Sequence, residues 1–108
     1  MKTAFAFVVA ITAAFLAPVT ASAKPTARTA IVLVDKLAFG AIPSNLRIGD
    51  TIIWANRDLF RHSATAKSHF DVDLPPSTRR RMVLTKAGAF PFTCKFHPGM
   101  KGVLKVRP

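Results

Sequence analysis

Residues 88–100 read Gly88-Ala89-Phe90-Pro91-Phe92-Thr93-Cys94-Lys95-Phe96-His97-Pro98-Gly99-Met100. In the first half of this stretch Phe90, Phe92 and Cys94 occupy alternate positions. A period of two is that of a β-strand with one face turned to a core. The alternation therefore predicts a strand whose last inward side chain is the Cys94 thiol, packed beside aromatic rings.

The second half of the stretch gathers three uncommon side chains. The chain has one Cys, three His and three Met, and Cys94, His97 and Met100 follow each other at a Cys-x-x-His-x-x-Met spacing. Two imidazoles, one thiolate and a weak axial thioether are the donors of a blue-copper electron-transfer centre. The second imidazole is expected from His62, which follows a strand-like run far upstream. We therefore predict one copper ion, alternating between Cu+ and Cu2+, bound by His62, Cys94, His97 and Met100.

The rest of the chain outside its first 23 residues consists of short apolar or alternating runs separated by turn residues. Strands are expected at 29–34, 46–48, 51–56, 63–66, 70–74, 78–85, 90–94 and 102–106. Runs 46–48 and 51–56 flank Gly49-Asp50 and are interpreted as a hairpin-like unit, with Trp54 in the core. No sustained helical period is present outside the first 23 residues. The pattern predicts an all-β sandwich with Greek-key connections.

The first 23 residues have the composition of an export signal. Lys2 gives a positive start, an apolar or small run follows from Ala4 to Ala17, and residues 21–23 offer a small-x-small pattern. We interpret 1–23 as a signal peptide cleaved after Ala23, and 24–108 as one copper-binding domain. An uncleaved membrane anchor is disfavoured because the apolar run is short for a span. No membrane span is expected in the mature chain, which is predicted to be periplasmic.

The lone thiol of the chain agrees with a metal site. The sequence has 108 residues, a formal net charge of +11 and a single Cys. In an oxidising compartment an unpaired Cys is open to dimerisation or over-oxidation unless something protects it. Coordination of copper by Cys94 would give that protection, and it would leave no free thiol to explain.

These motifs together resemble the cupredoxins, the small blue-copper proteins, and within them the plastocyanin and amicyanin group. The matching residues run in the family's order: Phe39 through Pro43, Leu46 through Thr51, Trp54-Ala55-Asn56, His62, Gly88, Phe92-Thr93-Cys94, His97, Met100 and Gly102-Val103. The resemblance implies a copper-binding Greek-key sandwich that shuttles electrons between larger periplasmic redox proteins. The family usually has Asn directly after its first His ligand, whereas this chain has Ser63.

Two polar side chains near the predicted ligands are candidates to support the site, whereas the third His and one further Met are not expected to bind metal. The Ser63 hydroxyl is a candidate to join the His62 loop to the Cys94 loop, and Asn56 is a second candidate for such work; a solvated polar residue is the alternative for each. His69 lacks a metal-site spacing and is interpreted as an ordinary surface or rim residue, and Met82 is interpreted as a core residue.

The sequence favours electron transfer over several other functions. Four protein ligands leave no open position for a substrate, so an enzyme is not expected. A Cys/His hydrolase would need an accessible thiol, which the alternation buries. The excess of Lys and Arg does not indicate nucleic-acid binding, because no nucleic-acid motif is present, and basic faces are usually just solvated. Four cations nevertheless flank the predicted ligands in sequence, which suggests the hypothesis of a redox partner with an acidic docking surface: Arg57, Arg61, Lys95 and Lys101. A copper carrier or storage protein that exchanges metal rather than electrons is the closest alternative.

Overall fold

A computed structural model of the chain describes residues 2–21 and 26–108. Residues 2–21 are extended, contain no helix or strand, and expose their side chains. The predicted cleavage point after Ala23 lies outside the described residues. Within the described ranges no helix is long and apolar enough to cross a membrane.

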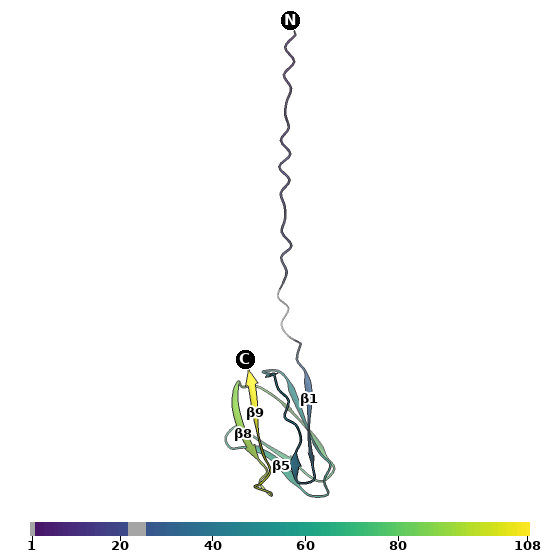
Figure 1. Cartoon of the computed structure of the whole chain (residues 1–108), viewed down its shortest axis with the longest axis vertical. Coiled ribbons are helices and arrows are strands. Elements are labelled where there is room, and N and C mark those ends of the chain that lie inside the picture. The colour runs from purple at the N-terminus through teal and green to yellow at the C-terminus, as the bar shows by residue number, and fades with distance from the viewer. Residues whose placement is uncertain (1, 22–25) are drawn as a thin grey trace.

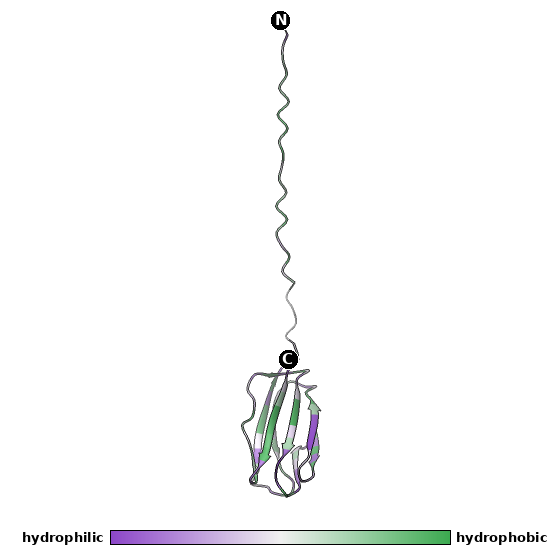
Figure 2. Ribbon diagram, turned by 90° about the vertical axis from the view of Figure 1, so that its right-hand side faces the viewer, coloured by the Kyte–Doolittle hydropathy of each residue, from purple (hydrophilic) through white to green (hydrophobic). Residues whose placement is uncertain are grey.

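Nine strands form within the described residues. They are β1 (Thr29–Asp35), β2 (Ala38–Phe39), β3 (Leu46–Arg47), β4 (Thr51–Asn56), β5 (His62–Ala66), β6 (Phe70–Leu74), β7 (Arg79–Val83), β8 (Gly88–Thr93) and β9 (Lys101–Arg107). Every longer run expected from the sequence forms a strand close to its predicted place. The strands carry most of the hydrophobic residues of the sandwich (Figure 2).

The strands form two facing sheets (Figure 1). One sheet has the order β2-β1-β4-β7 and the other β3-β9-β8-β5-β6. β1 pairs with β4 and β3 with β9 in parallel, while the remaining pairs are antiparallel. Because β4 and β5, and again β6, β7 and β8, lie in alternate sheets, the chain crosses repeatedly between layers. This architecture confirms the predicted all-β Greek-key sandwich.

The predicted pairing of runs 46–48 and 51–56 is wrong. β3 pairs with the end of β9, Leu46 opposite Val106, whereas β4 pairs with β1 and β7 in the other sheet. Between them Gly49 adopts a φ of 95°, and both carboxylate oxygens of Asp50 accept backbone N–H groups, from Arg28 and Arg47. These bonds hold the chain where it passes from one sheet to the other, so the turn joins layers instead of closing a hairpin.

The core is centred on aromatic rings from both sheets. Trp54 and Phe92 are buried, and their ring centroids lie 5.2 Å apart in an edge arrangement. Phe39 packs edge-on against Phe92 at 4.9 Å. Phe90, Phe92 and Cys94 all point inward, as their alternation predicts. Because large aromatic side chains dominate core energetics, Phe92 anchors β8 two residues before the thiol and thereby fixes the side on which that thiol emerges.

Candidate metal centre

The predicted ligands lie at the end of the sandwich where β4, β5 and β8 meet their loops. His62 is the first residue of β5, and Cys94 directly follows β8. His97 and Met100 belong to the loop between β8 and β9, at the end opposite the start of β1 (Figure 1). His62 and Cys94 are buried, whereas His97 is half-buried.

Three donor atoms converge at this point. Nδ1 of His62 lies 3.2 Å from Nδ1 of His97, and Cys94 Sγ lies 3.8 Å from each of these nitrogens. A triangle with these sides places all three atoms about 2.1 Å from a common centre, within the roughly 2.0–2.3 Å that zinc, another first-row ion, keeps from nitrogen and thiolate ligands. The two imidazoles and the thiol therefore fit one metal ion without rearrangement.

Backbone hydrogen bonds join Met100 to Cys94 and to His97. The side chain is buried, the Cys94 N–H donates to the Met100 carbonyl at 3.0 Å, and the Met100 N–H donates to the His97 carbonyl at 2.9 Å. These two bonds close the loop of residues 94–100 and bring Met100 back to Cys94. The thioether of Met100 remains the predicted fourth donor.

The Ser63 hydroxyl joins the His62 loop to the Cys94 loop, and its full burial excludes the alternative of a solvated polar residue. The Lys95 N–H donates to Ser63 Oγ at 2.9 Å, and the Ser63 N–H donates to Cys94 Sγ at 3.4 Å. On the outer side, Ser63 Oγ lies 2.9 Å from Thr65 Oγ1, which donates to Asp71, and Asp71 accepts the Lys95 ammonium at 2.9 Å. These hydrogen bonds form a closed ring of four residues that links the two loops: Ser63, Thr65, Asp71 and Lys95.

Asn56 supports the other flank of the site. Its Nδ2 group donates to the carbonyls of Phe60, Leu74 and Pro75, and its Oδ1 accepts the Asp58 N–H. Asn56 therefore fixes the loop that leads into His62 against the end of β6, and it does not reach the Cys94 loop.

Asp58 is a site residue that sequence reasoning missed. Its Oδ2 lies 2.7 Å from Nε2 of His62, and its two oxygens accept the backbone N–H groups of Lys36 and Leu37. These bonds, that from Leu37 foremost, lower the pKa of Asp58 to about 2 against the opposing effect of burial. The carboxylate is thus charged across the physiological range. Its position four residues before His62 in a loop follows no periodic pattern that could have identified it.

The surface around the half-buried His97 is apolar. Phe60 and Phe96 are both exposed, and the Phe60 ring meets the His97 ring edge-on with centroids 6.2 Å apart. The guanidinium of Arg61 lies over the Phe96 ring at 5.3 Å. The imidazole of His97, beside the Phe60 ring, is the least buried of the three clustered side chains.

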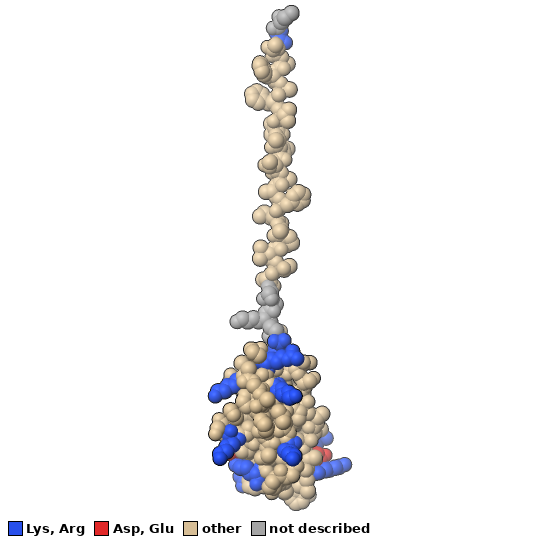
Figure 3. All heavy atoms as spheres, turned by 60° about the vertical axis from the view of Figure 1, so that its left-hand side comes forward, with Lys and Arg blue, Asp and Glu red and all other residues tan. Residues whose placement is uncertain are grey.

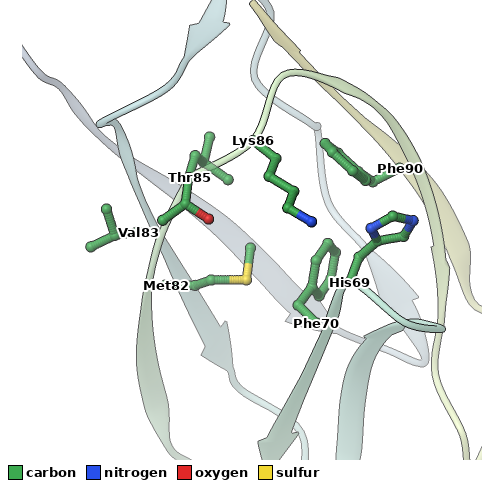
Figure 4. Close-up of a pocket in the computed structure, with 8 residues that line it drawn as sticks. His69, Phe70, Met82, Val83, Thr85, Lys86 and Phe90 are labelled. Carbon is green, nitrogen blue, oxygen red and sulfur yellow. The ribbon is translucent and has the colours of Figure 1, made fainter. Parts of the chain in front are cut away.

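His69 and Met82 lie away from the cluster, as their interpretation predicts. His69 is exposed and packs edge-on against Phe90 at 4.8 Å, while Met82 is half-buried and packs against the core. Both line a cavity of about 170 Å³ near the start of β8, in which none of the four predicted ligands takes part (Figure 4).

The two-sheet topology and the position of the cluster define the fold as that of the cupredoxins. Among solved structures, amicyanin shares it: a methionine-to-glutamine variant in the Cu(I) state has a TM-score of 0.64 and 21% identity, covering 73% of this chain and 82% of that chain. Amicyanin from Paracoccus versutus has a TM-score of 0.61 and 20% identity, covering 71% and 79%. No family model and no curated protein matches the chain.

The chemistry of the donors narrows the choice of metal. Thiolate together with imidazole suits Cu, Zn and Fe, and a trigonal His₂Cys set beside a buried thioether is the arrangement typical of blue copper. The cluster in this fold therefore supports one copper ion. The same burial of Cys94 disfavours a nucleophilic thiol, because an attacking sulfur must reach its substrate.

Proposed function

We propose that this protein is a one-electron carrier with a mononuclear type 1 copper site held by His62, Cys94, His97 and Met100. The triangle formed by Nδ1 of His62, Nδ1 of His97 and Sγ of Cys94 carries the proposal. The fold shared with amicyanin supports it. When bound, copper supplies reversible one-electron chemistry between Cu+ and Cu2+.

The chain's own residues would keep the site rigid. The Ser63 N–H donates to Cys94 Sγ and so helps to hold the sulfur in place. The Lys95 N–H on Ser63 Oγ and the Met100 carbonyl on the Cys94 N–H hold the ligand loops from two sides. A site that does not rearrange loses little energy to reorganisation when its charge changes. Four protein donors leave no position for a substrate, so we propose no catalytic activity.

Electrons would enter and leave at the exposed edge of His97. The exposed ring of Phe60 lies beside His97, and the exposed Phe96 precedes His97 in the chain, so a partner would meet apolar surface that is readily desolvated. Such a surface fits brief docking by a larger redox protein.

Charge would guide that partner. Lys and Arg side chains are spread over the face seen in Figure 3. Close to the ligands, however, Arg61 pairs with Asp73 and Lys95 with Asp71, so these two cations are largely neutralised. Arg57 and Lys101 have no ion pair among the described residues. We therefore propose an acidic partner surface steered by the unpaired cations, and expect transfer rates to fall as salt rises. Salt-independent rates would contradict this steering.

We further propose that residues 1–23 export the protein and that residues 24–108 act in the periplasm. The apolar run of Ala4 to Ala17 and the small residues at 21–23 support this proposal. Mass spectrometry of the protein recovered from a periplasmic fraction would find an N-terminus at Lys24. An intact N-terminus in a membrane fraction would contradict it.

Visible absorption after addition of Cu(II) tests the main proposal. An intense blue thiolate-to-copper band is expected for the protein and for Met82→Leu, a control methionine outside the site, and no band for Cys94→Ala. A Met100→Leu variant should keep the band but change its position, since the axial donor tunes the site. Absence of the band while the Cys94 thiol remains titratable would refute the electron carrier. Rapid loss of copper from the folded protein to a chelator would favour the copper carrier instead.

A further inference from the structure

Asp58 joins a predicted copper ligand to a strained turn. Its Oδ2 lies 2.7 Å from Nε2 of His62; the His62 side chain is fully buried and the Asp58 side chain is largely buried, with 10% of it exposed. The same carboxylate accepts the N–H groups of Lys36 at 2.7 Å and Leu37 at 3.0 Å. Three donors thus converge on one carboxylate that the sequence did not single out.

The contact with Asp58 determines which nitrogen of His62 can bind a metal. A neutral imidazole carries one N–H and one lone pair, and an ionised carboxylate can only accept a hydrogen bond. Facing Asp58, the Nε2 atom must carry the proton. The lone pair is then on Nδ1, the atom that lies 3.2 Å from Nδ1 of His97 and 3.8 Å from Cys94 Sγ.

The turn explains why the carboxylate does not move away. Lys36 and Leu37 form the two-residue loop between Asp35 and Ala38, with φ of 52° and 59°. Such a turn favours Asn and Gly, and a bulky residue with positive φ is a genuine outlier. Both of its N–H groups point at the Asp58 carboxylate, so the turn and Asp58 hold each other in place. Backbone strain retained beside a binding site is commonly part of its preorganisation.

We propose that Asp58 is a positioning residue that locks His62 in its Nε2–H tautomer and, through its buried negative charge, lowers the reduction potential of the copper centre. The inference rests on the proposed function. A carboxylate behind a histidine ligand raises the basicity of that ligand and favours the more highly charged metal ion. The oxidised state is thus stabilised relative to the reduced state.

The test separates this electrostatic role from support of the turn. Asp58→Asn keeps the size of the side chain but removes its charge and leaves one acceptor oxygen for three donors. Lys36→Asn/Leu37→Gly supplies the residues that this turn prefers, so the turn no longer needs the carboxylate. The triple variant combines both changes, and it carries the test where Asp58→Asn alone is poorly folded.

Two readouts are measured on the full chain. ¹⁵N NMR of the protein without added metal reports the His62 tautomer, and spectroelectrochemistry of the copper-loaded protein reports the potential. Asp58→Asn should lower the Nε2–H population. It should also weaken Cu(II) binding relative to Cu(I) by roughly tenfold, which raises the potential by about 59 mV. The turn variant should match the unmodified protein, and the triple variant should match Asp58→Asn.

Three results would overturn the inference. One is an unchanged tautomer in the Asp58→Asn and triple variants. Another is an unchanged potential in both. The third is a potential restored by the turn substitutions, since Asp58 would then act only by supporting the turn. Failure of the proposed function is distinguishable: the unmodified protein would then show no blue band, while the tautomer measured without metal would still decide whether Asp58 positions His62.

Discussion

Gly102→Ala should destabilise the sandwich by forcing a methyl group into a filled space. Gly102 lies opposite Phe92 in the β8–β9 ladder, and an added Cβ would lie 2.6 Å from Cζ and 3.0 Å from Cε1 of that ring. Phe92 cannot withdraw easily, because Trp54 and Phe39 meet it edge-on at 5.2 and 4.9 Å. Overpacking of this kind costs about 1–3 kcal/mol of the free energy of unfolding, and each kcal/mol lowers Tm by roughly 4–8 °C in a domain of this size.

Two further glycines provide matched controls. At Gly99 an added Cβ meets no atom within 4 Å, so Gly99→Ala should leave the stability of the metal-free protein nearly unchanged. At Gly49 there is also no atom within 4 Å, but φ is 95°, so a loss of stability there would come from the backbone alone. Denaturant unfolding of the three variants therefore separates a steric effect from a conformational one.

A double-mutant cycle gives the decisive measurement. If the clash with the Phe92 ring causes the loss, Gly102→Ala should cost less in a Phe92→Leu background than in the unmodified protein, because the smaller side chain leaves room for the methyl group. The same penalty in both backgrounds would refute this reasoning. So would a Gly102→Ala variant as stable as Gly99→Ala.

Three further predictions concern the ligand loops, the sheet crossing and the exposed edge. Ser63→Ala should lower the free energy of unfolding by about 1–3 kcal/mol, because it leaves the Lys95 N–H without its acceptor. The blue band should remain, because the backbone N–H of residue 63 still donates to Cys94 Sγ. Loss of the band would contradict this prediction. The hydrogen bond from the Arg28 N–H is the main cause that lowers the pKa of Asp50 in the folded state. The Asp50 carboxylate therefore stabilises the fold at pH values above its ordinary pKa of 3.8, and this stabilisation is lost as the pH falls through the lower folded-state pKa. Asp50→Asn should flatten this acid dependence of the free energy of unfolding. Phe60→Ala, beside the His97 ring, should slow electron self-exchange with no change in the copper band.

The convergence of His62, Cys94 and His97 was predictable because its determinants are local or chemical. Alternation of Phe90, Phe92 and Cys94 sets the direction of the thiol without knowledge of any partner strand. His97 follows in a loop too short to move far from Cys94. Only His62 is distant in sequence, and scarcity identified it: with three histidines in the chain, few could supply the second imidazole.

The features that the sequence did not predict depend on contacts distant in the chain. Nothing near Leu46 indicates that its strand pairs with Val106, so proximity to the next strand suggested a hairpin that does not form. Asp58 looks like an ordinary loop residue until the turn at residues 36–37 is brought against it. Long-range pairing and buried polar networks are decided by tertiary packing, which a local pattern does not encode.

Ser63 shows how one such network tolerates a change of residue. The position after the first histidine has two tasks: its backbone N–H donates to Cys94 Sγ, and its side chain accepts the Lys95 N–H. The first task is independent of the side chain, and the second needs only an acceptor at the right distance. Since Thr65 Oγ1 donates to Asp71, it can accept the Ser63 hydroxyl hydrogen and orient the oxygen toward Lys95. A short hydroxyl side chain thereby does the work of the longer amide usual in cupredoxins, provided that a second hydroxyl and a carboxylate stand behind it.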